Sequence, residues 1–160
     1  MGRSVSCRPP LASSRGAALV ELSISIFLLV LLLVGAADFA RVYHHTIDLE
    51  NAARAGAQYG AQSIGNSVDI DGMKAAATQA APDTALTPSA TYECWCATDD
   101  AATYTYYDAA GCDALEECPT NQHLIVRVTV TTSYDFQTIA SFGGIFDLPM
   151  ITRSATMRAQ

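Results

Sequence analysis

One long apolar run dominates the first third of the chain. From Ala17 to Ala37 there are 21 residues, and Glu21 is the only charged one. About 20 apolar residues are enough for a helix to cross a hydrocarbon core of roughly 30 Å. The run therefore predicts a transmembrane helix over residues 17–37. A charge inside such a helix costs about 2.5–3.5 kcal/mol, so Glu21 is expected to have a partner or a function.

The helical pattern continues beyond the apolar run. Residues 38–64 contain no proline, and polar and apolar positions recur at steps of three and four, which is a helix period. The polar side includes Arg41, His44, His45, Asp48, Asn51, Gln58 and Gln62, and the other side includes Phe39, Val42, Tyr43, Thr46, Leu49, Ala53, Gly56, Ala57 and Gly60. This pattern predicts an amphipathic continuation whose small residues, Gly56 and Gly60 among them, allow a sheet to approach closely.

A break and a weaker helix are expected next. Gly65-Asn66-Ser67 interrupts the first helix, and Met73 to Ala80 is rich in alanine up to Pro82. Asp69 or Asp71 can cap this second helix by accepting backbone N–H bonds.

The last part of the chain reads as a sheet. Tyr92–Ala97 and Thr103–Tyr107 predict a hairpin, and His123–Tyr134 alternates over a long β-branched run, which is typical of a strand. Ile151–Arg158 is expected to form a closing strand, antiparallel to its predecessor, after a loop or short helical turn at Ile139–Leu148. The predicted fold class is α+β, with a long N-terminal helix on a small antiparallel sheet. The head would span residues 38–160, and residues 90–160 would be mainly sheet.

Four of the five cysteines lie in the predicted hairpin region. They are Cys94, Cys96, Cys112 and Cys118, and the fifth, Cys7, precedes the apolar run. An even number in a small exported head predicts two disulfides, each contributing about 2–4 kcal/mol. A Cys94–Cys96 bond would close a strained ring, so crosswise bonds from the first pair to the second are favoured. Zinc binding is the alternative, but Cys-x-Cys with Cys-x5-Cys departs from the usual spacing.

Charge indicates how the chain lies in a membrane. Arg3, Arg8 and Arg15 precede the apolar run, and all sixteen acidic residues follow Gly16. Basic residues mark the cytoplasmic side, so the N-terminus is expected in the cytoplasm and the head in the periplasm. The acidic head makes nucleic acid an improbable partner. An ordinary cleaved signal peptide is the alternative, but its apolar region is shorter and the small-residue sites after Val34 are weak.

The residues from Gly16 onward resemble the type IV prepilin signature. Gly16 is followed by Ala17-Ala18-Leu19-Val20-Glu21. The resemblance implies that a prepilin peptidase removes residues 1–16 as a leader and leaves Glu21 as the fifth residue of the mature chain. The new α-amino group at Ala17 would then offset the charge of Glu21 on a neighbouring subunit.

Two further segments resemble the TadE-like family of tight-adherence pilus systems. They are Asp38-Phe39-Ala40-Arg41 and Leu49-Glu50-Asn51-Ala52-Ala53-Arg54-Ala55-Gly56-Ala57-Gln58-Tyr59. The order of β-branched and aromatic residues from Val126 to Arg158 is also similar to the end of these proteins, whereas the cysteine-rich middle is not. Asp38, Ala40 and Leu22 replace residues that are more common in the family.

The resemblance implies a minor pilin or pseudopilin in the bacterial inner membrane. Its expected partners are prepilin peptidase, other pilin subunits, inner-membrane pilus assembly proteins and the lipid bilayer. The alternatives are a periplasmic binding module that has a single membrane anchor and never polymerises, and a type II secretion pseudopilin.

Catalytic, metal and cofactor sites are not expected. His44 and His45 are neighbours on a helix and are therefore expected not to share one face, while His123 opens a strand. A calcium loop at Asp69–Gly72 would lack the acidic ligands needed at its first and last positions. Tyr92, Trp95, Tyr104, Tyr106 and Tyr107 are read as core and strand-face residues rather than as an adhesive patch.

Overall fold

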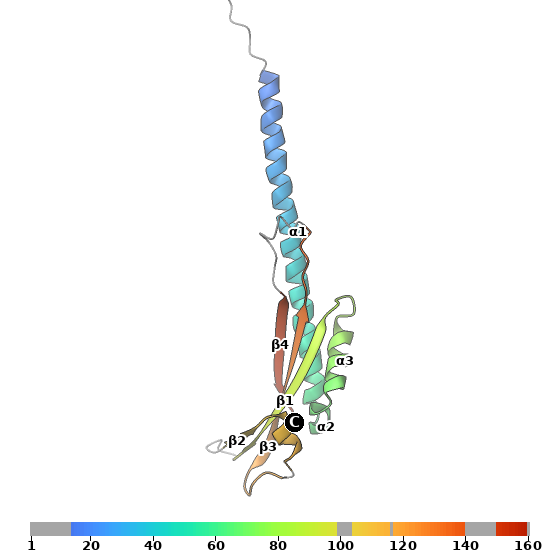
Figure 1. Ribbon diagram of the computed structural model, residues 1–160, viewed down its shortest axis with the longest axis vertical. Helices are drawn as coiled ribbons and strands as arrows, with labels where there is room; N and C mark the ends of the chain where they lie inside the picture. The colour runs from blue at the N-terminus through green and yellow to red at the C-terminus, as the bar shows by residue number, and fades with distance from the viewer. Residues whose placement is uncertain (1–13, 99–103, 116, 140–149, 160) are drawn as a thin grey trace, which may run out of the picture. The chain divides into compact units, whose positions relative to one another are not determined.

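The computed structural model describes residues 14–98, 104–115, 117–139 and 150–159. The chain divides after Asp38 into two compact units, and the long helix α1 (Ser14–Ala61) contributes to both. The second unit, called the head below, begins at Phe39 and contains the remaining elements (Figure 1). These are α2 (Ile64–Ser67), α3 (Ile70–Ala80), β1 (Thr87–Ala97), β2 (Tyr104–Tyr107), α4 (Ala109–Asp113), β3 (His123–Tyr134) and β4 (Ile151–Arg158).

The four strands form one antiparallel sheet in the order β2-β1-β3-β4. Side chains alternate between its two faces, so that one face is buried and the other lies open to solvent. The buried face carries Ala90, Tyr92, Cys94, Val126, Val128 and Val130. The α+β fold class predicted from the sequence, with a long helix on a small stapled antiparallel sheet, is confirmed.

Helix α1 lies against this buried face through small residues. Leu49, Ala52, Ala53 and Ala57 are fully buried. A Cβ atom added at Gly56 would lie 2.8 Å from the carbonyl oxygen of Met73 in α3 and 3.0 Å from Val130 in β3. Gly56 and Gly60 therefore permit the close approach of helix and sheet that the sequence predicted.

One buried hydrogen bond fixes the helix against the sheet. The Thr132 hydroxyl in β3 donates to the Leu49 carbonyl of α1 over 2.8 Å, and both residues are fully buried. Two residues on the predicted apolar side of the helix do not pack, however. Phe39 is 74% exposed and Tyr43 is 63% exposed, so the prediction was wrong for these two, which precede the fully buried part of the helix.

Short polar caps shape the segment between α1 and β1. Asp69, one of the two predicted caps, accepts from the Gly72 amide at 2.9 Å and starts α3, which adds Met73 and Ala77 to the core. The predicted break is placed differently. Helix α1 ends at Ala61, before the expected Ile64, and Ser63 caps a separate helical turn, so Gly65-Asn66-Ser67 is helical rather than a breaker.

The remaining strand predictions hold with two additions. Strands β3 and β4 have the predicted bounds, and the β1–β2 hairpin is present, but β1 starts five residues earlier, at Thr87. Helix α4 was not predicted. The expected loop or turn at Ile139–Leu148 lies outside the described residues, apart from its first position.

Candidate functional site

The N-terminal unit is an apolar helix with an uncovered surface. Leu19, Phe27 and Leu32 are 65%, 68% and 74% exposed. Among the described residues, α1 is the one helix long and apolar enough to span a membrane. So much exposed apolar surface is stable only in lipid or against other apolar chains.

The predicted assembly residue Glu21 lies on this apolar helix. Its side chain is exposed, and among the described side chains none forms a hydrogen bond or ion pair with it. The nearby hydroxyl of Ser23 is satisfied because it donates to the Leu19 carbonyl at 2.8 Å. Among the described residues of this unit, the carboxylate of Glu21 is therefore a charged group with no partner in the described chain.

The predicted cleavage position, Gly16–Ala17, lies in the first turn of α1. The first four N–H groups of a helix have no intrahelical acceptor, so opening this turn breaks few hydrogen bonds. No atom lies within 4 Å of the place where a Cβ of Gly16 would be. The Gly16–Ala17 bond thus lies in a turn of α1 where few intrahelical hydrogen bonds hold the backbone.

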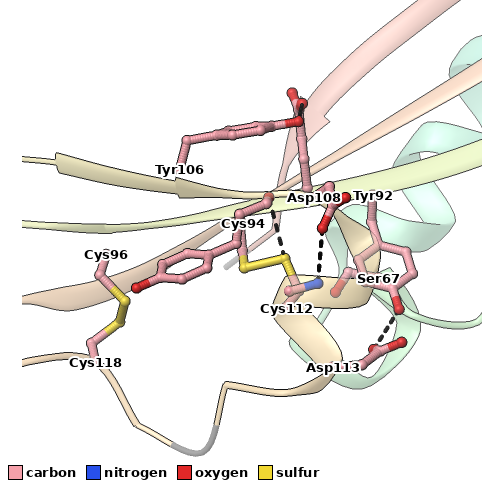
Figure 2. The surroundings of a disulfide bond; sticks show 12 residues. Ser67, Tyr92, Cys94, Cys96, Tyr106, Asp108, Cys112, Asp113 and Cys118 are labelled. Atoms are coloured by element: carbon pink, nitrogen blue, oxygen red, sulfur yellow. Dashed lines mark hydrogen bonds between the residues drawn. A yellow bond between two sulfur atoms is a disulfide. The ribbon is translucent and has the colours of Figure 1, made fainter.

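Two disulfides staple the hairpin of the head. Cys94 is bonded to Cys112 and Cys96 to Cys118, which is a crosswise arrangement of the kind the sequence favoured (Figure 2). The first bond ties α4 to the buried face of β1, and Asp108 caps α4 by accepting from the Gly111 amide at 2.9 Å. The four thiols are bonded to one another, so they do not form the alternative zinc site. Cys7 lies outside the described residues.

Tyr92 fixes α4 to the sheet from within the core. Its ring is buried, and its hydroxyl donates to the exposed carboxylate of Asp113 (Figure 2). This hydrogen bond, followed by burial, raises the pKa of Tyr92 to about 12.

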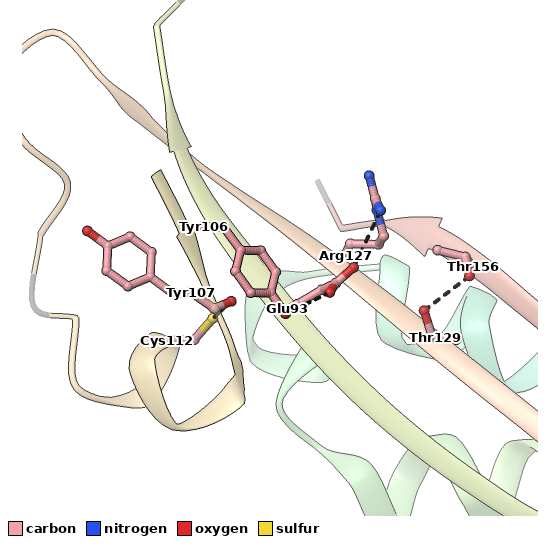
Figure 3. Close-up of polar contacts among 7 residues, drawn as sticks. All are labelled: Glu93, Tyr106, Tyr107, Cys112, Arg127, Thr129 and Thr156. Carbon is pink, nitrogen blue, oxygen red and sulfur yellow. Dashed lines mark hydrogen bonds and ion pairs between the residues drawn. The ribbon is translucent and has the colours of Figure 1, made fainter. Parts of the chain in front are cut away.

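The open face of the sheet carries a small charged and aromatic cluster. The Arg127 guanidinium lies over the Trp95 ring, 4.3 Å from its centroid, and pairs with Glu93 at 3.4 Å. Tyr106 also donates to Glu93, at 3.2 Å (Figure 3). That hydrogen bond is the main cause that raises the pKa of Tyr106.

These contacts refine the prediction for the aromatic residues. Tyr92 is a core residue, whereas Tyr104 and Tyr106 are 68% and 54% exposed and lie on the strand surface. The Arg127 guanidinium covers the Trp95 ring, and Glu93 accepts a hydrogen bond from the Tyr106 hydroxyl. The charged and aromatic side chains on this face of the sheet therefore contact one another.

The two neighbouring histidines come closer than the sequence suggested. One ligating atom each from His44, His45 and Asp48 lie within 4.8 Å of one another. The two rings still face different surroundings, since His44 is exposed and His45 is half-buried, but Asp48, one turn further on, brings a carboxylate close to both. His123 lies at the opposite end of β3 from Tyr134, on which the His45 ring stacks.

Comparison with known proteins bears on the N-terminal helix. Residues 16–58 match the family model described as TadE-like protein. This stretch is similar to TadE-like proteins and is called the TadE-like segment below. It begins at Gly16, includes Glu21, and ends within the part of α1 that packs on the sheet. No curated protein and no solved structure matches the chain.

The match covers 43 of the 160 residues, so it concerns the N-terminal helix and not the whole chain. The match confirms the suspected resemblance over the helix. It does not extend to β3 and β4, so the resemblance of the C-terminal strands stays a prediction.

Proposed function

We propose that the chain is a minor pilin or pseudopilin of a tight-adherence pilus. The observation that carries this proposal is the TadE-like segment, which begins at Gly16 and places Glu21 in an otherwise apolar helix. The protein is held in the bacterial inner membrane with its N-terminus in the cytoplasm and its head in the periplasm. Its function is assembly with other pilins and inner-membrane assembly proteins, and it is carried into the filament.

Prepilin peptidase cuts after Gly16 in this account. Cleavage removes Arg3, Arg8 and Arg15 and leaves a positive α-amino group at Ala17. That group is what a carboxylate in an apolar environment needs, because an opposite charge within about 4–6 Å favours the ionised form. An exposed apolar helix end and an acid without a described partner both support this step.

Glu21 then selects the docked position of the subunit. An isolated acidic group within the bilayer costs about 2.5–3.5 kcal/mol on insertion scales, and pairing with an α-amino group of a neighbouring subunit removes part of that cost. A difference of 1.4 kcal/mol in docking free energy changes occupancy about tenfold. One carboxylate is therefore sufficient to decide whether the subunit is incorporated.

The test replaces Glu21 by glutamine, which keeps the shape and removes the charge. The matched control is Glu50→Gln, on the same helix but in the head, where Glu50 pairs with Arg54 on an exposed surface. Exposed pairs of this kind contribute about 0–1 kcal/mol. The protein is measured in membranes and in filaments sheared from cells, and intact mass shows whether each variant has lost its leader.

We expect Glu21→Gln to be processed normally and to fall about tenfold or more in sheared filaments, while Glu50→Gln stays at the wild-type level. Equal amounts of both variants in filaments would refute the role of Glu21. Absence of the wild-type protein from filaments, with unchanged membrane levels for both variants, would favour the singly anchored binding module.

A further inference from the structure

A second group of polar side chains lies on the head part of α1. His44 Nδ1 is 2.9 Å from Asp48 Oδ2, and a ligating atom of His45 lies within 4.8 Å of both residues' ligating atoms. Residues three and four apart on a helix are neighbours on its surface. Asp48 is four residues after His44 and three after His45, so its carboxylate lies beside both imidazoles.

The spacing of these atoms suits a small transition-metal ion. Zinc is held by histidine nitrogen at about 2.0–2.1 Å and by carboxylate oxygen at about 2.0–2.2 Å, usually with tetrahedral angles. Two such ligands are then about 3.3–3.5 Å apart. The observed separations, 2.9 Å for one pair and at most 4.8 Å for the others, lie on either side of this value.

Contacts from other elements hold two of the three side chains in place. The His45 ring stacks on Tyr134 of β3, with 4.5 Å between centroids, and meets Phe136 edge-on at 6.1 Å. The Thr84 hydroxyl donates to Asp48 at 3.3 Å. Outer contacts that orient ligands in this way are a regular part of metal sites.

His45 also has a nitrogen that the fold does not use. Its Nδ1 atom is buried and has no hydrogen-bond partner in the described part of the chain. A buried polar atom without a partner requires an explanation, and a bound ion is one. An ordinary surface ion pair explains the contact of His44 with Asp48, but it leaves the orientation and the unused nitrogen of His45 unexplained.

We propose that His44, His45 and Asp48 form a site for a divalent transition-metal ion of the Zn²⁺ class. Two imidazoles and one carboxylate suit zinc, copper or nickel, whereas calcium and magnesium need more oxygen ligands. Three protein ligands leave a fourth position for water or for an outside group. The nearby Arg41, whose guanidinium lies 5.1 Å from the Phe136 ring centroid, opposes cation binding and limits the affinity.

The experiment measures zinc binding to the full chain in detergent. The protein carries no histidine tag, and Cys7→Ser is present throughout so that no free thiol competes. Zinc is titrated against a chromophoric chelator into the parent protein and into His44→Gln, His45→Gln and Asp48→Asn. The matched control is His123→Gln, since His123 is eleven residues from Tyr134 along β3, roughly 36 Å away at strand spacing.

We expect one Zn²⁺ per chain, bound at least about tenfold more weakly by each of the three variants and unchanged by His123→Gln. Excess Mg²⁺ should not displace it. Because His44 is 76% exposed, His44→Gln retains the fold, and circular dichroism checks this. Zinc binding that survives His44→Gln, falls equally in His123→Gln, or is absent from the parent protein would overturn the proposal.

Discussion

The close packing of α1 on the head makes a quantitative prediction for two glycines. A Cβ at Gly56 would lie 2.8 Å from the Met73 carbonyl oxygen, and a Cβ at Gly60 would lie 2.5 Å from the Met73 sulfur and 3.2 Å from Val128. Real Cβ atoms do not come so close to other heavy atoms. Substitution by alanine must therefore move one element away from the other.

The two substitutions differ in what has to move. At Gly56 the added Cβ would meet the backbone carbonyl oxygen of Met73 in α3, which cannot rotate away. At Gly60 it would meet mainly the Met73 side chain, which is fully buried but flexible. Overpacking costs about 1–3 kcal/mol, and replacing a helical glycine by alanine gains about 1 kcal/mol. We expect a net loss of about 1–2 kcal/mol for Gly56→Ala and about 0–1 kcal/mol for Gly60→Ala.

Thermal unfolding of the head, followed by circular dichroism in detergent with the disulfides intact, measures these losses. Gly56→Ala should lower the Tm by roughly 4–10 °C. The matched control is Gly65→Ala in α2, where the new Cβ would meet only the Ser63 hydroxyl at 3.8 Å, an ordinary contact that leaves the Tm unchanged or slightly higher. If Gly56→Ala is as stable as Gly65→Ala, the helix does not approach α3 as closely as described.

Three further predictions concern the head. Tyr92→Phe should cost about 1–2 kcal/mol of unfolding free energy at pH 8, because the hydrogen bond to Asp113 is lost. That bond raises the pKa of Tyr92 to about 12, so its contribution to stability is complete below the ordinary tyrosine pKa near 10 and disappears as the pH rises through 12. Urea titrations of the two proteins should therefore converge at high pH. Asp69→Ala should lower the Tm at pH 7 but not at pH 2, because hydrogen bonds from the Gly72 amide and then the Tyr59 hydroxyl lower the pKa of Asp69. The contribution of the Asp69 carboxylate to stability is therefore present above the ordinary carboxyl pKa near 4 and is lost as the pH falls. An equal drop in Tm at both pH values would contradict this prediction. Removing the bond that closes 22 residues, by replacing Cys96 and its partner with serine, should cost about 3 kcal/mol in urea unfolding, and an unchanged midpoint would show that the staple does not constrain the unfolded chain.

The elements that the sequence predicted well are those with a long, regular pattern. Strand β3 alternates over twelve residues, with Val126, Val128 and Val130 on the buried face, and its bounds match the prediction. The strand predicted at Tyr92–Ala97 is five residues shorter than β1, which starts at Thr87 and includes Pro88. Pro88 lies opposite Thr132 of β3, and β2 pairs only with Cys94–Ala97, so this part of β1 has an unpaired edge, the kind of position in a sheet where proline is tolerated.

Other features depend on contacts that no local pattern contains. Helix α4 has five residues, too few for a helical period, and it is held by Asp108 at its start and by the Cys94–Cys112 bond. Sequence spacing alone separated His44 from His45 by about 100° around the helix. It did not account for the reach of an imidazole or for the fixing of His45 by Tyr134.

The residues of the candidate assembly site, in contrast, were predicted from the sequence and not from contacts in the structure. Glu21 was singled out because it is the one acid in an apolar run, and Gly16 and Ala17 were predicted through the resemblance to the type IV prepilin signature. The structure adds that the Gly16–Ala17 bond lies in the first turn of α1 and that Glu21 is exposed. The partner of Glu21 is expected on another molecule, which the sequence of one chain does not specify.

The most direct test of this account is the intact mass of the protein extracted from its native membrane, with both disulfides accounted for. We predict a chain that begins at Ala17 and lacks residues 1–16, and a Gly16→Val variant that keeps its leader because a bulky side chain blocks the cleaved bond. A native chain that retains Arg3, Arg8 and Arg15, or one that begins at Asp38 after ordinary signal-peptide cleavage, would contradict the account.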